Sequence, residues 1–218
     1  MNVLITGSSR GIGLACARLF LARGHEVVGL DRLPAAIVQP AYTHHICDIA
    51  SDPLPAVPGV EILFCNAGVQ TGTDEDLRVN LAGSMRTAEA YAFQPAIRSV
   101  LFNASASALT GDECATYAAS KAGVVGYMRH CAIRLANEYR ACCNAICFGG
   151  VSTQLNREVM DDPARWGRIM EVTPLKRWAT PEEAAEWCYF LTAVNTFCTG
   201  QAIDVSGGER NCAALFVP

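Results

Sequence analysis

Three closely spaced glycines, Gly7, Gly11 and Gly13, follow a short apolar run at the start of the chain. The run Val3–Thr6 has the aliphatic and β-branched residues of a buried strand. Gly7 would permit a tight turn, Gly11 would let the backbone approach a ligand, and Gly13 would let a helix pack on the sheet. A helix starting at such a turn offers free amides and a positive dipole end to a diphosphate. We expect a dinucleotide-binding turn. No Gly-Lys-Ser/Thr follows the glycines, which excludes a P-loop.

Short apolar runs alternate with helical stretches along the rest of the chain, which predicts an α/β fold. We expect a Rossmann-type doubly wound parallel sheet of about seven strands with helices on both faces. The expected strands are Val3–Thr6, Glu26–Asp31, Thr43–Cys47, Glu61–Cys65, Val100–Ala104, Cys142–Phe148 and Gln201–Val205. The expected helices are Ile12–Arg23, Leu77–Ala92, Thr116–Glu138, Pro163–Met170 and Pro181–Thr192. Proline-containing stretches, Pro34–Tyr42 and Ser51–Gly59, read as loops. Without a repeat or a linker, residues 1–218 read as a single dinucleotide-binding domain.

Composition restricts the possible partners and cellular settings. Hydrophobic residues make up 51% and charged residues 17%, which is typical of a well-buried globular chain. The net charge of −4 provides no basic surface for nucleic acid or anionic lipid, and no apolar run approaches the roughly 20 residues that span a bilayer. The 11 cysteines include no Cys-x-x-Cys pair, so we expect no metal site. We also expect no signal peptide, because the first strand begins at once, and a cytoplasmic location in which the cysteines stay reduced.

A carboxylate at the end of the second expected strand indicates which dinucleotide would bind. Asp31 lies eighteen residues after Gly13 (31 − 13). At that place it can accept hydrogen bonds from ribose hydroxyls, and it would repel a 2′-phosphate. NAD is therefore favoured, although Arg10 or Arg32 could face a phosphate instead, so NADP remains possible. Asp48, at the end of the third strand, could reach an adenine edge or simply start a turn.

Tyr117 and Lys121 are four residues apart on an expected helix and would point in the same direction. An ammonium group beside a phenol favours the phenolate, so Lys121 would lower the pKa of Tyr117 toward the range where it can act as an acid or base. The alternative is an exposed helix with a half-buried tyrosine. Together with the dinucleotide turn, the pair favours an oxidoreductase.

Five segments in the same order resemble the short-chain dehydrogenase/reductase family in its single-domain form. They are Thr6–Gly13, Cys65–Gly68, Val79–Gly83, Tyr117–Lys121 and Asp204–Gly208. The resemblance implies hydride transfer between a nicotinamide cofactor and a secondary alcohol or ketone. Tyr117 would be the general acid/base, and Lys121 would bind the nicotinamide ribose. A serine would hold the substrate oxygen, and Asn80 would hold a proton-relaying water, unless it only caps a helix.

The resemblance also implies a set of cofactor contacts, in which Thr153 would bind the carboxamide. Those contacts are Gly7, Ser9, Arg10, Gly11, Ile12, Gly13, Asp31, Arg32, Asp48, Ile49, Asn66, Ala67, Gly68, Tyr117, Lys121, Val151 and Thr153. No metal ligand is implied.

The chain departs from the family pattern at three places. Ala104 stands thirteen residues before Tyr117 (117 − 104), where the family has its serine, so the catalytic serine is Ser105 or Ser107, with Ser105 favoured. The interval from Asn66 to Asn80 is shorter than usual. Phe148 replaces the proline that usually follows the sixth strand.

Substrate and assembly are less constrained. Residues 152–173 should form a variable substrate lid with both apolar and polar side chains. Small apolar residues on the expected helices Leu77–Ala92 and Thr116–Glu138 favour a homodimer or homotetramer, as is common in the family. Two alternatives remain: an NADP-dependent reductase of the 3-oxoacyl type, and a non-catalytic NAD-binding regulatory protein.

Overall fold

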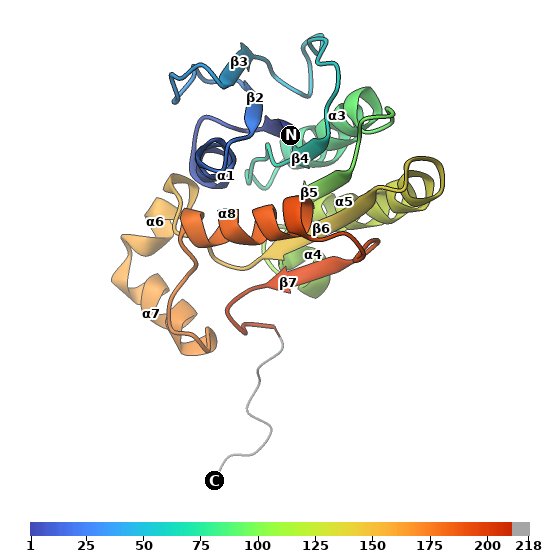
Figure 1. Cartoon of the computed structure of the whole chain (residues 1–218). Coiled ribbons are helices and arrows are strands. Elements are labelled where there is room, and N and C mark those ends of the chain that lie inside the picture. The colour runs from blue at the N-terminus through green and yellow to red at the C-terminus, as the bar shows by residue number, and fades with distance from the viewer. Residues whose placement is uncertain (211–218) are drawn as a thin grey trace.

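A parallel sheet of seven strands forms the centre of the computed structural model, which describes residues 1–210 (Figure 1). The strand order is β3-β2-β1-β4-β5-β6-β7, and every neighbouring pair is parallel. The strands are β1 (Asn2–Thr6), β2 (Glu26–Asp31), β3 (Tyr42–Ile46), β4 (Ile62–Cys65), β5 (Ser99–Asn103), β6 (Cys142–Phe148) and β7 (Ala202–Val205). The expected fold class is confirmed, and each expected strand is present with its ends shifted by at most one residue.

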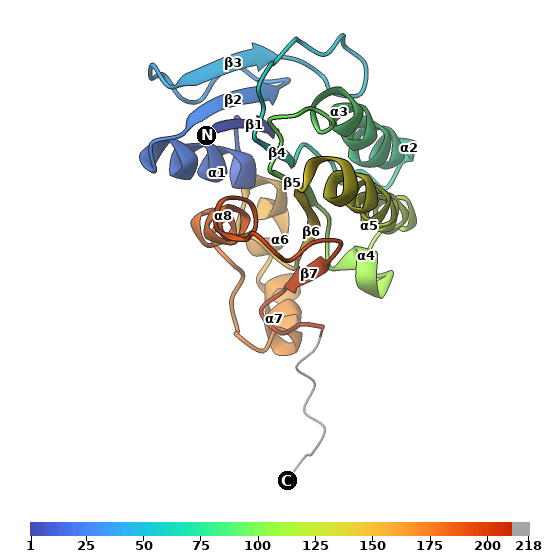
Figure 2. The same ribbon diagram turned by 45° about the vertical axis from the view of Figure 1, so that its right-hand side comes forward.

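Helices cover both faces of this sheet (Figure 2). The α-helices are α1 (Gly11–Ala22), α2 (Asp74–Asp76), α3 (Ser84–Tyr91), α4 (Ser107–Thr110), α5 (Ala115–Arg134), α6 (Arg157–Met160), α7 (Pro163–Val172) and α8 (Pro181–Tyr189). Helices α1 and α8 pack together on one face, while α3 and α5 lie on the other. Each face has its own apolar core, with Phe20 and Leu191 in the first and Met128 and Leu135 in the second.

Three of the predicted helices contain a wider, π-helical turn. The turn η1 (Leu77–Gly83) precedes α3, η2 (Leu135–Tyr139) follows α5, and η4 (Phe190–Val194) follows α8. The expected start of α8 is confirmed in detail: Thr180 accepts a hydrogen bond from the Glu183 amide, and the Glu183 carboxylate accepts one from the Thr180 amide. The sequence did not predict the short helices α4 and α6 or the 3₁₀ turn η3 (Gln154–Asn156).

The connections from β2 to β3 and from β3 to β4 are loops, as their prolines predicted. Crossovers between parallel strands usually contain a helix. Here residues 32–41 and 47–61 have none, which leaves β3 partly exposed at the edge of the sheet.

The strand order reverses between β1 and β4, which is where an open α/β sheet forms a crevice at the carboxyl ends of its strands. The connection after β1 runs through α1 to β2, whereas the connection after β4 runs through α3 to β5, so the two connections diverge to opposite sides of the sheet. The glycine-rich turn follows β1 directly. The topology therefore places this turn at the mouth of the crevice.

Candidate active site

The glycine-rich turn has the conformation that its glycines predict. Gly7 and Gly11 have positive φ angles of 69° and 53°, which side chains other than glycine rarely adopt. Gly13 is needed for a different reason, because a Cβ there would overlap the Gly7 carbonyl oxygen and the Asn66 side chain. The turn therefore exposes bare backbone beside the N-terminus of α1, which is the cradle that a diphosphate requires.

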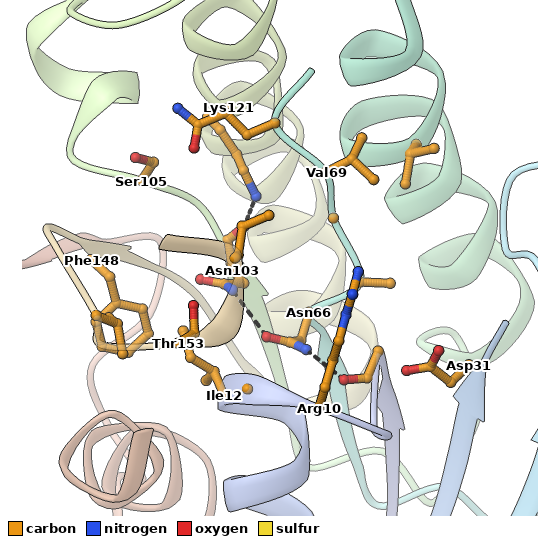
Figure 3. Close-up of a pocket in the computed structure, with 18 of the residues that line it drawn as sticks. Arg10, Ile12, Asp31, Asn66, Val69, Asn103, Ser105, Lys121, Phe148 and Thr153 are labelled. Atoms are coloured by element: carbon orange, nitrogen blue, oxygen red, sulfur yellow. Dashed lines mark hydrogen bonds between the residues drawn. The ribbon is translucent and has the colours of Figure 1, made fainter. Parts of the chain in front are cut away.

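Asn66 joins the ends of three strands beneath this turn. Its Nδ2 donates to the Thr6 carbonyl (2.9 Å) and to the Gly7 carbonyl (3.2 Å), and its Oδ1 accepts from Asn103 Nδ2 (3.0 Å) (Figure 3). Thr6 completes the junction, since its hydroxyl accepts from the backbone amides of Asn66 and Ala67. This network holds β1, β4 and β5 in register at the crevice.

One continuous pocket runs across the carboxyl ends of the strands, with Asp31 at one end and Ser105 and Phe148 at the other (Figure 3). Most of the predicted site residues line it. They are Gly7, Arg10, Gly11, Ile12, Asp31, Arg32, Asp48, Ile49, Asn66, Ala67, Gly68, Ser105, Tyr117, Lys121, Val151 and Thr153. Three predicted residues lie behind its wall: Ser9, Gly13 and Asn80.

The Asp31 carboxylate is held in place by two backbone amides. Its Oδ2 accepts from Ser9 N and its Oδ1 from Leu33 N, each at 2.9 Å. Ser9 therefore helps indirectly, by fixing the charge that faces the pocket. Asp48 has the turn-starting role that the sequence left open, because its Oδ1 accepts from the Ala50 amide at 2.8 Å, and it lines the same pocket.

Lys121 is buried, with 4% of its surface exposed, and its Nζ donates to the Asn103 carbonyl oxygen at 2.8 Å. The ammonium group lies 5.7 Å from the centre of the Tyr117 ring. Burial lowers the pKa of Lys121 to about 8, because the charged form loses its hydration. The helix α5 thus brings the pair together as the four-residue spacing predicted.

The pKa of Tyr117 moves in the direction opposite to the one that Lys121 alone would cause. Burial raises it to about 12, and a hydrogen bond with Ser105 counteracts part of this rise. The spacing in the sequence indicated only that the charge of Lys121 would lower the pKa of Tyr117. In the folded chain, desolvation of the phenolate has the larger effect and raises this pKa. As a base, Tyr117 would therefore work best at alkaline pH.

The two candidate serines lie close together but face different partners. Their hydroxyl oxygens are 2.9 Å apart. Ser105 lines the pocket beside Tyr117, whereas Ser107 begins α4 and donates to Glu113 Oε2 at 2.8 Å. This arrangement favours Ser105 as the serine that would hold a substrate oxygen.

Asn80 is buried inside η1, and both ends of its side-chain amide are hydrogen-bonded to protein groups. Its Oδ1 accepts from the Val69 amide, and its Nδ2 donates to the Val69 carbonyl and to Ser120 Oγ. It therefore ties the segment after β4 to α5, and it does not line the pocket. Its predicted role in holding a water remains a prediction.

The pocket residues that the sequence did not indicate as part of the site include the polar side chains of Asn103, Gln70 and Glu113. Asn103 ends β5, and its position at a strand end next to the expected crevice was a usable signal. Gln70 and Glu113 lie in loops and belong to no motif, so no sequence pattern indicated them. Within residues 1–210, no group of three His, Cys, Asp or Glu side chains could hold a metal ion.

Comparisons with known proteins agree with this geometry. The model of a family described as enoyl-(acyl carrier protein) reductase matches residues 62–209. The chain is 32% identical to the 3-oxoacyl-[acyl-carrier-protein] reductase MabA of Mycobacterium bovis, over 95% of this chain and 92% of that protein. It is 28% identical to a glucose 1-dehydrogenase of Gluconobacter oxydans, over 95% and 91%. A putative 2-deoxy-D-gluconate 3-dehydrogenase from Agrobacterium tumefaciens, solved with bound NADP, superposes with a TM-score of 0.83 at 26% identity, over 95% of each chain.

Fold, pocket and relatives together define an NAD(P)-dependent oxidoreductase that acts on CH–OH groups. The glycine turn follows β1, and Tyr117 and Lys121 lie on α5, as the sequence predicted. One pocket joins the turn to this pair. The chain belongs to the short-chain dehydrogenase/reductase family.

Proposed function

We propose that the chain interconverts a secondary alcohol and its ketone with NAD as the favoured cofactor, and with Tyr117 as the general acid/base. The observation that carries this proposal is the single pocket that connects the glycine turn and Asp31 to Tyr117, Lys121 and Ser105. The residues fit a dinucleotide, since the turn leaves bare backbone at a helix N-terminus and the pocket extends from there to the phenol.

Each side chain has a separate task. When bound, the nicotinamide ring supplies or accepts the hydride. Tyr117 exchanges the proton of the substrate oxygen, and Ser105 donates a hydrogen bond that orients this oxygen and stabilises its developing charge. Lys121 places a positive charge beside the phenol and a donor near the cofactor ribose. Asn80 positions the wall of the site through Val69 and Ser120, and we retain the proposal that it also holds a relay water.

The preference for NAD rests on the anchored carboxylate of Asp31. Asp31→Ala, and also Asp31→Asn, should increase kcat/KM for NADP⁺ relative to NAD⁺ by about tenfold or more, because each removes a charge that repels a 2′-phosphate. Steady-state rates with both cofactors measure the ratio. Glu26→Gln is the control, since Glu26 is exposed at the opposite end of β2 and lies outside the pocket lining. Equal use of NADPH and NADH by the unaltered protein would contradict the preference.

A second candidate is an NADP-dependent reductase of 3-oxoacyl thioesters. Arg10 and Arg32 both line the pocket near Asp31 and could face a 2′-phosphate, and MabA, a relative at 32% identity, is a 3-oxoacyl reductase. The anchored carboxylate of Asp31 argues against this candidate. A non-catalytic regulatory role is less well supported, because Tyr117, Lys121 and Ser105 are all present at one pocket.

We expect a homo-oligomer, a dimer or tetramer, in solution. Within the described residues, Met85 of α3 and Ile133 of α5 are exposed apolar side chains on the two helices that the sequence singled out. Light scattering at micromolar concentration measures the mass, and a monomer would contradict this expectation.

In residues 1–210, no helix is long and apolar enough to cross a bilayer. A cytoplasmic location and a single domain with a lid at 152–173 remain proposals.

A further inference from the structure

Glu113 is a pocket residue that the proposed chemistry does not use. It lies in an exposed turn between α4 and α5, yet its carboxylate lines the pocket together with Ser105 and Tyr117. Its φ angle is 74°, a left-handed conformation that is uncommon for a residue with a side chain. Such a conformation persists only where the surroundings hold it, and here the Asp112 carboxylate accepts from the Glu113 amide at 2.8 Å.

Within the described residues, 1–210, the hydrogen bonds to this carboxylate all go to one of its oxygens. Oε2 accepts from Ser107 Oγ at 2.8 Å and from Gln70 Nε2 at 3.1 Å. Among residues 1–210, no hydrogen bond to Oε1 is found. The serine and the glutamine thus hold one oxygen of a residue that lines the pocket beside Ser105 and Tyr117, and they leave the other oxygen, Oε1, able to accept a further hydrogen bond.

The Glu113 carboxylate also acts electrostatically on the catalytic pair. Burial raises the pKa of Glu113, and its charge contributes to the raised pKa of Tyr117. A negative charge at this place repels anionic substrates. An apolar chain laid against it would leave the carboxylate desolvated without a donor, which is costly.

We propose that Glu113 binds a substrate hydroxyl next to the reacting CH–OH group, so that the substrate is a neutral polyol or sugar rather than a hydroxy acid or an acyl chain. This inference rests on the proposed function. A hydroxyl donates directly to the unused oxygen, and hydrogen bonds to charged groups are stronger than those between neutral groups. The neighbouring Gln70 amide and Ser107 hydroxyl suit a substrate with several hydroxyl groups, since both can hydrogen-bond neutral partners.

Three small alcohols test the proposal, because they differ only in the group beside the reacting carbon. Isopropanol has a methyl group there, propylene glycol a hydroxymethyl group, and lactate a carboxylate. We expect kcat/KM to be about tenfold or more higher for propylene glycol than for isopropanol, and lower for lactate than for isopropanol. Isopropanolamine, which carries an ammonium group, should not exceed propylene glycol by a similar factor, because the charge of Lys121 acts at the same place and repels a second cation. A strong preference for isopropanolamine would overturn the assignment to neutral polyols.

Two variants separate the charge from the side chain. Glu113→Gln keeps the shape and removes the charge, and Glu113→Gly removes the side chain while suiting the positive φ angle. Both should abolish most of the preference for propylene glycol and raise the lactate-to-isopropanol ratio. Glu182→Gln is the control, because Glu182 is exposed and lies outside both the pocket lining and the proposed lid.

The outcomes distinguish this inference from the proposed function. Failure to oxidise any of the four alcohols with NAD⁺ or NADP⁺ contradicts the proposed function. Turnover with equal kcat/KM for isopropanol and propylene glycol contradicts the role of Glu113 alone. The role of Glu113 is also contradicted if both Glu113 variants keep the preference for propylene glycol over isopropanol that Glu182→Gln shows.

Discussion

Tyr117→Phe is expected to reduce turnover by at least about 10²-fold while NADH still binds. The substitution keeps the ring and its packing in α5 but removes the hydroxyl that must give or take the substrate proton. In the unaltered protein, the rate of alcohol oxidation should rise up to about pH 8 and then level off, because the phenolate of Tyr117 becomes more populated up to its pKa of about 12 while Lys121 loses its charge above its pKa of about 8. Steady-state rates between pH 6 and 10 measure both effects, and NADH fluorescence measures binding.

The neighbouring serines are the matched controls for this experiment. With isopropanol, which has no second hydroxyl for Glu113 to bind, Ser105→Ala should lower turnover, since Ser105 lines the pocket beside Tyr117, whereas Ser107→Ala should have a much smaller effect. Near-normal turnover in Tyr117→Phe would disprove the proposed acid/base role. A larger loss at Ser107 than at Ser105 would reverse the serine assignment.

Lys121→Met is expected to abolish most turnover and, at the same time, to relieve an electrostatic cost of folding. Turnover should fall by about 10²-fold, because the charged donor beside the phenol and the cofactor ribose is lost. The charge is buried, and the pKa of Lys121 is lowered from 10.5 to about 8. Such a shift corresponds to a destabilisation on the order of 3 kcal/mol wherever the lysine is charged in the folded state.

The sign of the pH dependence follows from this lowered pKa. Below pH 8 the lysine is charged in both states and the full cost is present, whereas above pH 10.5 it is neutral in both and the cost is gone. We compare the free energy of unfolding of Lys121→Met with that of the unaltered protein at each pH. The variant's value relative to the unaltered protein should be higher at pH 7 than at pH 10.5, by a difference on the order of 3 kcal/mol. The Asn103 carbonyl loses its donor at both pH values, so this loss cancels in the comparison. Urea unfolding measures the free energy of unfolding of both proteins at both pH values. The prediction is refuted if the difference between the two proteins is the same at pH 7 and at pH 10.5.

Local patterns were sufficient for the cofactor end of the site. Gly7, Gly11 and Gly13 have the conformations and close contacts that their spacing predicted, and Asp31 ends β2 as expected. These features depend on backbone geometry over a few residues, and the residue types in such a short segment determine that geometry. The capping box at Thr180 and Glu183 was predictable for the same reason.

The substrate end was less predictable. Glu113 and Gln70 meet across 43 residues of chain, and neither belongs to a motif. The choice between Ser105 and Ser107 also depended on their partners, because only the folded chain directs Ser107 toward Glu113. Loop residues of this kind are brought together by the strands and helices that carry them, so no short stretch of sequence indicates their neighbours.

By itself, the sequence determined the order of strands and helices, the dinucleotide turn and the placement of Tyr117 and Lys121 on one side of a helix. The tertiary structure decided how these groups behave: Lys121 is buried against the Asn103 carbonyl, and the pKa of Tyr117 rises where the sequence argument expected it to fall. The physical reason is that a side chain's direction along a helix follows from residue spacing, whereas its hydration depends on residues distant in the chain that pack around it.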